Sequence, residues 1–349
     1  MRTTVVLLLL AGFAMAQPPA PAIKPTLITL KKDDATLGDV AADLSNSASG
    51  VAVKPGNPEL AKAKCTVAAD GTPFWNTLES VADQTKSRLV LRDGGRTVVL
   101  EPRRQGRELS SVAGPFRIVP RSVTGRLLLD QGSAFHEIEL DVHWEPRVRV
   151  YRIDTQPRIT KAEDDRGTTL IADTGASHHY PTASHTDMKF RLTGLTRESK
   201  QIATLAGEFR ATAAEKLLSI PFKNLADKFP MTKTEAGVTV VLKSFEMIGG
   251  TWDAELALTY PEGHPEFESF EEQKWLRDNR LRLVGPDASV HEPDNDDVVA
   301  SGRRVAATYR FKLPANTNPR GKGWSLLCET PVPLTELKVP FVLKGIPLP

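Results

Sequence analysis

Cysteine is nearly absent from this chain of 349 residues, which contains only Cys65 and Cys328. Two cysteines so far apart cannot form the framework of a small disulfide-stabilised domain. Both lie in strand-like segments, KCTVAA and SLLCETP, where a buried free thiol is the commoner state of the residue. We therefore expect two free thiols, and a bridge between Cys65 and Cys328 is the alternative.

An excess of one charge is also lacking, since 45 basic and 43 acidic residues leave a net charge of +2. Nucleic-acid binding requires a basic field, and a membrane-surface patch requires clustered Lys and Arg, which here are scattered. After residue 16, no stretch approaches the about 18 consecutive apolar residues of a membrane-spanning helix. These absences argue against a nucleic-acid partner and against a membrane-spanning chain.

The first 16 residues have the parts of a secretory signal peptide. Arg2 supplies the positive charge, residues 5–16 are apolar, and the run Ala-Met-Ala at 14–16 is a small-residue cleavage site. We expect cleavage before Gln17 and a Pro-rich leader over residues 17–25. The sequence predicts an exported protein of the periplasm or the extracellular space.

A small α/β domain is predicted over residues 26–103, in the order β-α-β-β-α-β-β. The first helix follows the N-cap Thr36, and the second has Thr72 as its cap and Pro73 at its first position. Trp75 is expected to pack in the core. The apolar faces of the two helices are Leu37, Val40, Ala41 and Leu44, and Phe74, Leu78, Val81 and Ala82.

Three pieces of this region resemble a known family. They are LITLKKDDATLGDVAADLS, CTVAADGTPFWNTLESVADQTK and the closing hairpin SRLVLRDGGRTVVLEP. In this order they resemble the short N-terminal domain that secretins share with TonB-dependent receptors, over residues 25–103. The resemblance implies a non-enzymatic periplasmic module that contacts partner proteins and has no catalytic residues. Neither a secretin pore nor a receptor barrel follows it in this chain.

Beyond a linker at residues 104–113, the pattern changes to alternating strands such as FHEIELDVHW and TWDAELALTY. Such strands form antiparallel sheets with one wetted face, which two packed sheets can bury. We predict an α+β fold with β-sandwiches over residues 114–228 and 236–349. The second includes a short helix, PEFESFEEQKWLRDNR, and its tail KVPFVLKGIPLP resembles the last strand of uncharacterised exported bacterial proteins.

The segment LIADTGASHHY contains the most suggestive motif of the chain. Asp173, Thr174 and Gly175 match the catalytic turn of a retropepsin-like aspartic protease, which needs two aspartates that share one proton. Asp-Thr-Gly occurs once, so a homodimer would have to supply the second aspartate. The segment EMIGG, ending at Gly250, would have to pack behind the turn. We favour an ordinary turn, with the protease as the alternative.

Two other polar segments could be considered for metals. His178, His179 and His185 could supply zinc ligands, and the acidic run at 292–299 could bind calcium. Neighbouring histidines of an extended chain point in opposite directions, and the acidic run lacks the spacing of an EF-hand. We expect solvated loops at both places and predict no metal and no cofactor.

The residues therefore favour an exported, non-catalytic envelope adaptor that acts through protein–protein contacts. Its partner would be another envelope protein, and its oligomeric state stays open. A carbohydrate-binding sandwich that uses Trp252, Tyr260 or Trp324 is a further alternative. Because these three aromatic residues lie in strand patterns, we expect them in the core.

Overall fold

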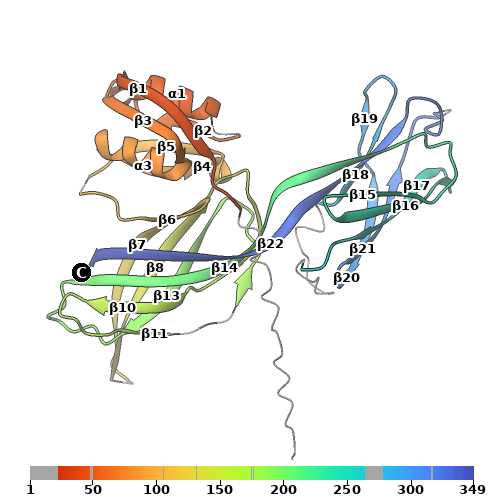
Figure 1. The fold of residues 1–349 in the computed structure, drawn as a ribbon. Coiled ribbons are helices and arrows are strands. Elements are labelled where there is room, and N and C mark those ends of the chain that lie inside the picture. Colours follow the sequence, from red (N-terminus) through yellow and green to blue (C-terminus); the bar gives the residue numbers. More distant parts are fainter. Residues whose placement is uncertain are drawn as a thin grey trace, which may run out of the picture.

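The computed structural model describes residues 23–349, apart from 48–49, 105, 131, 174, 176, 264–277 and 316. A small α/β domain lies against one β-sandwich, and two long strands join that sandwich to a second one (Figure 1). The predicted α+β fold with antiparallel sandwiches is confirmed. The expected signal peptide at 1–16 and residues 17–22 of the expected leader lie outside the described residues.

The α/β domain has its strands and two longer helices in the predicted order, with the short helix α2 and a 3-10 turn at Asp93–Gly95 added. These elements are β1 (Leu27–Thr36), α1 (Leu37–Ser47), β2 (Ala52–Pro55), α2 (Pro58–Ala61), β3 (Lys64–Pro73), α3 (Phe74–Gln84), β4 (Ser87–Arg92) and β5 (Thr97–Pro102). β1 pairs with β3, and β5 lies between β2 and β4 in a second sheet. The added helix α2 begins after Asn57, whose side chain accepts the Leu60 N–H at 2.7 Å.

Local sequence signals explain where the two longer helices begin. The Thr36 hydroxyl accepts the Asp39 N–H at 3.2 Å and so caps α1 as predicted. Helix α3 begins at Phe74, and Pro73 is its N-cap, so the predicted cap Thr72 and the predicted first helical position of Pro73 are both wrong by one residue. Thr72 still pairs with Ile28 of β1, which keeps it in an extended strand. The predicted apolar faces of both helices are buried, together with Trp75.

Three antiparallel sheets form the two sandwiches. Their strands are β6 (Ser111–Ala113), β7 (Phe116–Leu128), β8 (Ser133–Trp144), β9 (Arg149–Asp154), β10 (Arg158–Asp164), β11 (Ile171–Ala172), β12 (His178–His179), β13 (His185–Thr193), β14 (Gln201–Lys223), β15 (Met231–Glu235), β16 (Val238–Ile248), β17 (Thr251–Thr259), β18 (Arg280–Val284), β19 (Val290–His291), β20 (Asn295–Ser301), β21 (Arg304–Phe311) and β22 (Ser325–Pro347). Sheet 1 has the order β11-β13-β8-β7-β6, and sheet 3 has the order β15-β16-β17-β21-β20. Sheet 2, with the order β12-β9-β14-β22-β18-β19 and β10 beside β14, contributes to both sandwiches.

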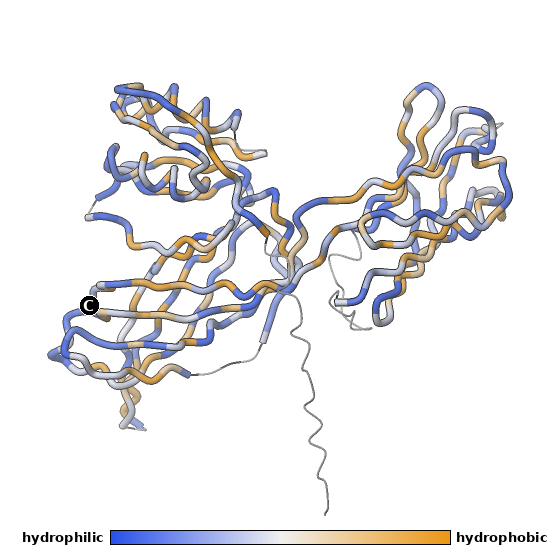
Figure 2. The backbone as a smooth tube through the Cα atoms, in the orientation of Figure 1, coloured by the Kyte–Doolittle hydropathy of each residue, from blue (hydrophilic) through white to orange (hydrophobic). Residues whose placement is uncertain are grey.

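Many of the strands alternate between buried and exposed residues, as the sequence pattern predicted. In β13, for example, every second side chain is buried. The same alternation is visible along many strands in Figure 2. One face of each sheet therefore contributes to a core and the other meets solvent.

Strands β14 and β22 pass from one sandwich into the other (Figure 1). Each has 23 residues, and they pair with each other along almost their whole length. At roughly 3.4 Å per residue, each strand is about 75 Å long, which is enough to enter two cores. Phe209 and Phe341 are buried in the first core, whereas Phe222 and Leu326 are buried in the second.

The structure therefore divides the chain differently from the predicted sandwiches at 114–228 and 236–349. Val339 and Ile346, near the C-terminus, belong to the core of the first sandwich. Phe222 of β14 already belongs to the second. Alternation in a strand has the same period on either side of such a crossing, so the sequence pattern does not reveal it.

The structure also bears on the predicted linker and on the predicted helix of the second sandwich. The end of the predicted linker at 104–113 is not a linker, because Ser111–Ala113 form β6 and pair with β7. Most of the predicted helix PEFESFEEQKWLRDNR falls within 264–277, outside the described residues.

The α/β domain is docked on the first sandwich through buried polar contacts. The indole N–H of Trp75 donates to the Pro115 carbonyl at 2.9 Å. The Arg117 guanidinium, whose side chain is 1% exposed, donates to Glu79 at 2.8 Å and to Glu108 at 2.6 Å. Glu79 lies on α3 and Arg117 on β7, so this ion pair crosses the interface.

A second buried carboxylate strengthens the same interface. Glu145 is 2% exposed and accepts the Thr26 N–H at 3.0 Å, just before β1. The Arg147 guanidinium donates to the Glu145 carboxylate at 2.7 Å. Buried charges are stable only when they are paired in this way, so the two domains hold a defined relative position.

The two cysteines are free and buried, as expected. Cys65 lies in the core of the α/β domain and Cys328 in the core of the second sandwich. A bridge between them is therefore excluded by the fold. Among the described helices, none has the length and apolar character needed to cross a bilayer.

Candidate functional site

Asp173 lies just after β11 and is exposed to solvent. Its backbone N–H donates to the Arg191 carbonyl at 3.0 Å, and its carboxylate Oδ1 accepts the Arg191 N–H at 2.7 Å. The side chain thus extends the pairing of β11 with β13 by one residue. Thr174 lies outside the described residues, and Gly175 is exposed.

The segment EMIGG, which the protease hypothesis requires behind the catalytic turn, does not pack against Asp173. The segment ending at Gly250 forms the end of β16 and the turn to β17, in sheet 3 of the second sandwich. Asp173 follows a strand of sheet 1 in the first sandwich, so this segment does not pack behind it. The aspartic protease stays a prediction, and the contacts of Asp173 with the described residues do not support it.

The three clustered histidines lie in strands of two different sheets, not in one loop. His178 and His179 form β12 beside β9, whereas His185 begins β13 opposite His143 of β8. The His179 Nε2 is 2.8 Å from the Thr186 hydroxyl. Within the described ranges, no group of three or more His, Cys, Asp or Glu residues could hold a metal ion.

The acidic run at 292–299 is not a free loop either, because its second half belongs to the edge strand β20. Asp297 forms an ion pair with Arg310 at 3.0 Å. The Asp294 carboxylate accepts the Lys312 N–H at 2.6 Å. These carboxylates stabilise the β20–β21 edge.

The three candidate carbohydrate-binding aromatics belong to the second core. Tyr260 is 1% exposed, and Trp252 and Trp324 are partly buried against the same cluster. The Tyr260 hydroxyl donates to the Asn279 side chain at 3.0 Å. This placement agrees with the expected core packing, and it presents no open row of aromatic rings to a sugar.

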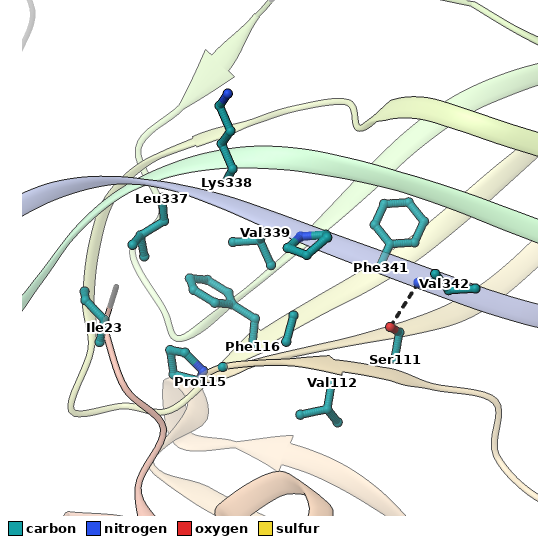
Figure 3. A pocket seen from close by; sticks show the side chains of 13 residues that line it. Ile23, Ser111, Val112, Pro115, Phe116, Leu337, Lys338, Val339, Phe341 and Val342 are labelled. Atoms are coloured by element: carbon teal, nitrogen blue, oxygen red, sulfur yellow. Dashed lines mark hydrogen bonds between the residues drawn. The ribbon is translucent and has the colours of Figure 1, made fainter. Parts of the chain in front are cut away.

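A groove of about 490 Å³ lies between the edges of β6 and β22 in the first sandwich (Figure 3). β6 is the outer strand of sheet 1, and β18 pairs with β22 only over Ser325–Glu329. In the described part of the chain, the rest of that edge of β22 has no strand partner. The lining residues are Ile23, Ser111, Val112, Ala113, Gly114, Pro115, Phe116, Leu337, Lys338, Val339, Pro340, Phe341 and Val342.

The lining of this groove is almost entirely uncharged. Phe116 and Val339 face each other across it, and Ile23 lies at one end (Figure 3). Among the described residues that line the groove, Lys338 is the one with a charge, and its side chain points away from the groove. A pocket of several hundred Å³ with an apolar lining and a few polar groups is typical of a binding site.

The polar groups of the groove come from the main chain. The Val342 N–H, which points away from β14, donates to the Ser111 hydroxyl at 3.1 Å (Figure 3). Because the main-chain groups of an antiparallel strand alternate in direction, Pro340 and Lys338 face the same side. The Pro340 and Lys338 carbonyls and the Lys338 N–H are thus directed toward the open edge.

The sequence did not single out these residues, although it contained one relevant signal. Pro340 interrupts the alternating run KVPFVLK, and proline within a strand indicates an edge. Ser111 and Val112 lay in the predicted linker, where no strand was expected. No local pattern could have shown that these two distant segments form opposite sides of one groove.

Comparisons of this chain with protein-family models, with curated proteins and with solved structures find no match.

Proposed function

We propose that this protein is an exported, non-catalytic adaptor of the cell envelope that binds another protein. The observation that carries the proposal is the groove between β6 and β22, an open sheet edge beside an apolar lining. Unpaired strand edges are surfaces that bind other polypeptides. Asp173, the residue that could have indicated catalysis, is instead bonded to the backbone of Arg191.

The arrangement of the α/β domain supports the same proposal. The ion pair of Arg117 with Glu79 and the bonds of Glu145 hold this domain against the sandwich that contains the groove. Its resemblance to the short N-terminal domain of secretins and TonB-dependent receptors, as a partner-contacting module, is part of the proposal. A rigid scaffold of this kind can present a binding surface at low entropic cost.

Affinity capture of the full chain from its own cell envelope tests this function. We expect one defined protein to be recovered in roughly equimolar amount by the tagged chain and not by the tag alone. Recovery of no partner would contradict the proposal. So would peptide cleavage at acid pH that disappears in Asp173→Asn, which would establish the protease alternative.

A further inference from the structure

The groove between β6 and β22 has the features of a site from which a strand is missing. In the first sandwich, β6 is the outer strand of sheet 1 and the part of β22 beyond Glu329 is the outer strand of sheet 2, so the groove opens along the side of the sandwich where both sheets end. Phe116, Val339 and Phe341, which line the opening, also belong to the core of that sandwich. Apolar side chains that entered here would extend an existing core.

The edge of β22 offers hydrogen bonds to such a strand. Lys338 has both a carbonyl and an N–H on this side, Pro340 has a carbonyl, and Val342 uses the Ser111 hydroxyl in place of a backbone partner. Pro340 removes one donor from the middle of the edge. A strand therefore gains little from hydrogen bonds alone, and its side chains must also fit the apolar lining.

Ile23 shows that the opening accepts an apolar side chain from outside the sandwich. It precedes the first strand of the α/β domain, yet it is 5% exposed and is part of the core of the first sandwich. The groove continues from Ile23 and Pro115, which belong to the established interface between the domains, toward Val342 (Figure 3). An added strand would thus continue an interface that the protein already has.

We propose that the groove binds an extended segment of a partner protein, added as a strand to the free edge of β22, with alternate apolar side chains in the groove. This inference names the site and the kind of partner for the proposed adaptor function, on which it rests. The near absence of charge from the lining fits an uncharged segment.

Two capped hexapeptides test this inference with the full chain in isothermal titration calorimetry. One alternates threonine with valine, and the other contains threonine only, so both have the same main chain. We expect the alternating peptide to bind at least tenfold more tightly. Equal affinities, or no binding of the alternating peptide, would overturn the proposal.

Two matched variants test whether the alternating peptide binds in the groove. Ala113→Trp places an indole in the groove, and Val299→Trp places one on β20 of the second sandwich, where Val299 is 68% exposed. We expect at least a tenfold loss of affinity in the first and no change in the second, with both variants folded by circular dichroism. Val342→Lys, at a 50% exposed edge position, is the second groove variant if Ala113→Trp does not fold. Unchanged binding by the folded groove variant would overturn the proposal.

The outcomes separate this inference from the proposed function. If a partner is captured equally by the wild type and by Val342→Lys, and the peptide does not bind, the groove inference fails while the adaptor function stands. If the peptide binds in the groove and no partner is captured, the adaptor function fails while the groove remains a strand-binding site.

Discussion

At the scale of single residues, His143 is the most informative titratable group. It lies on β8, is 8% exposed, and faces Trp75 of α3, Arg117 of β7 and His185 of β13. Burial is the main cause that lowers its pKa to about 3, and electrostatic interactions with Arg117 and His185 lower it further. The imidazole is therefore neutral in the folded protein at ordinary pH.

This lowered pKa predicts a loss of stability in acid. An unfolded histidine titrates near about 6.5, so unfolding takes up a proton at any pH between that value and the folded pKa of about 3. The contribution of the neutral His143 to the free energy of unfolding is therefore fully present above about pH 6.5 and is lost as the pH falls toward 3. Between pH 7 and pH 5, this group alone should cost about 2 kcal/mol of unfolding free energy.

Urea unfolding of the wild type and of His143→Gln at the two pH values measures this cost. The variant should lose about 2 kcal/mol less than the wild type over this interval. Identical pH dependences of the wild type and His143→Gln would show that His143 does not titrate as inferred.

At the scale of elements, the long strand β14 packs closely against its two neighbouring strands at Gly207. Gly207 lies between Ile159 of β10 and Phe341 of β22. A Cβ at this position would lie 2.7 Å from the Arg158 carbonyl oxygen and 2.9 Å from the Phe341 ring. Because the carbonyl belongs to the backbone, it cannot move aside without disturbing the strand pairing.

Gly207→Ala should therefore destabilise the fold by about 1–3 kcal/mol, the usual cost of overpacking. The midpoint of urea unfolding checks this value. Gly106→Ala is the control, since a Cβ at Gly106 meets nothing within 4 Å. If Gly207→Ala is as stable as the control, β14 and β10 can move apart to accommodate the added methyl group at little cost in free energy.

At the scale of the whole molecule, the docking of the α/β domain depends on a buried charge. Arg117→Ala would leave Glu79 and Glu108 without their partner at the interface. Removing one member of a buried pair commonly costs about 3–5 kcal/mol, although Glu79 and Glu108 can regain some hydration. We expect the α/β domain to unfold at a lower temperature than the sandwiches in this variant.

Differential scanning calorimetry checks this expectation, with Arg88→Ala as the matched control. Arg88 pairs with Glu101 at 2.8 Å, but its side chain is 54% exposed. An exposed pair contributes less than about 1 kcal/mol, so this control should retain the wild-type transition. A transition that stays at the wild-type temperature in Arg117→Ala would mean that other contacts hold the domain in place.

Taken by itself, the sequence determined what depends on local pattern. Alternation predicted the antiparallel sheets, helical periodicity predicted the buried faces of α1 and α3, and strand context predicted the buried thiols of Cys65 and Cys328. These features follow from neighbouring residues on one element. The sequence also gave Asp173 two interpretations, a turn or a catalytic aspartate.

Only the tertiary structure decided which distant segments meet. It placed the second half of β22 in the first sandwich and Ser111 opposite Val342, and it showed Asp173 bonded to the backbone of Arg191. The physical reason is that alternation specifies which side of a strand is buried but not which core buries it. Pairing between residues far apart in the chain makes that choice.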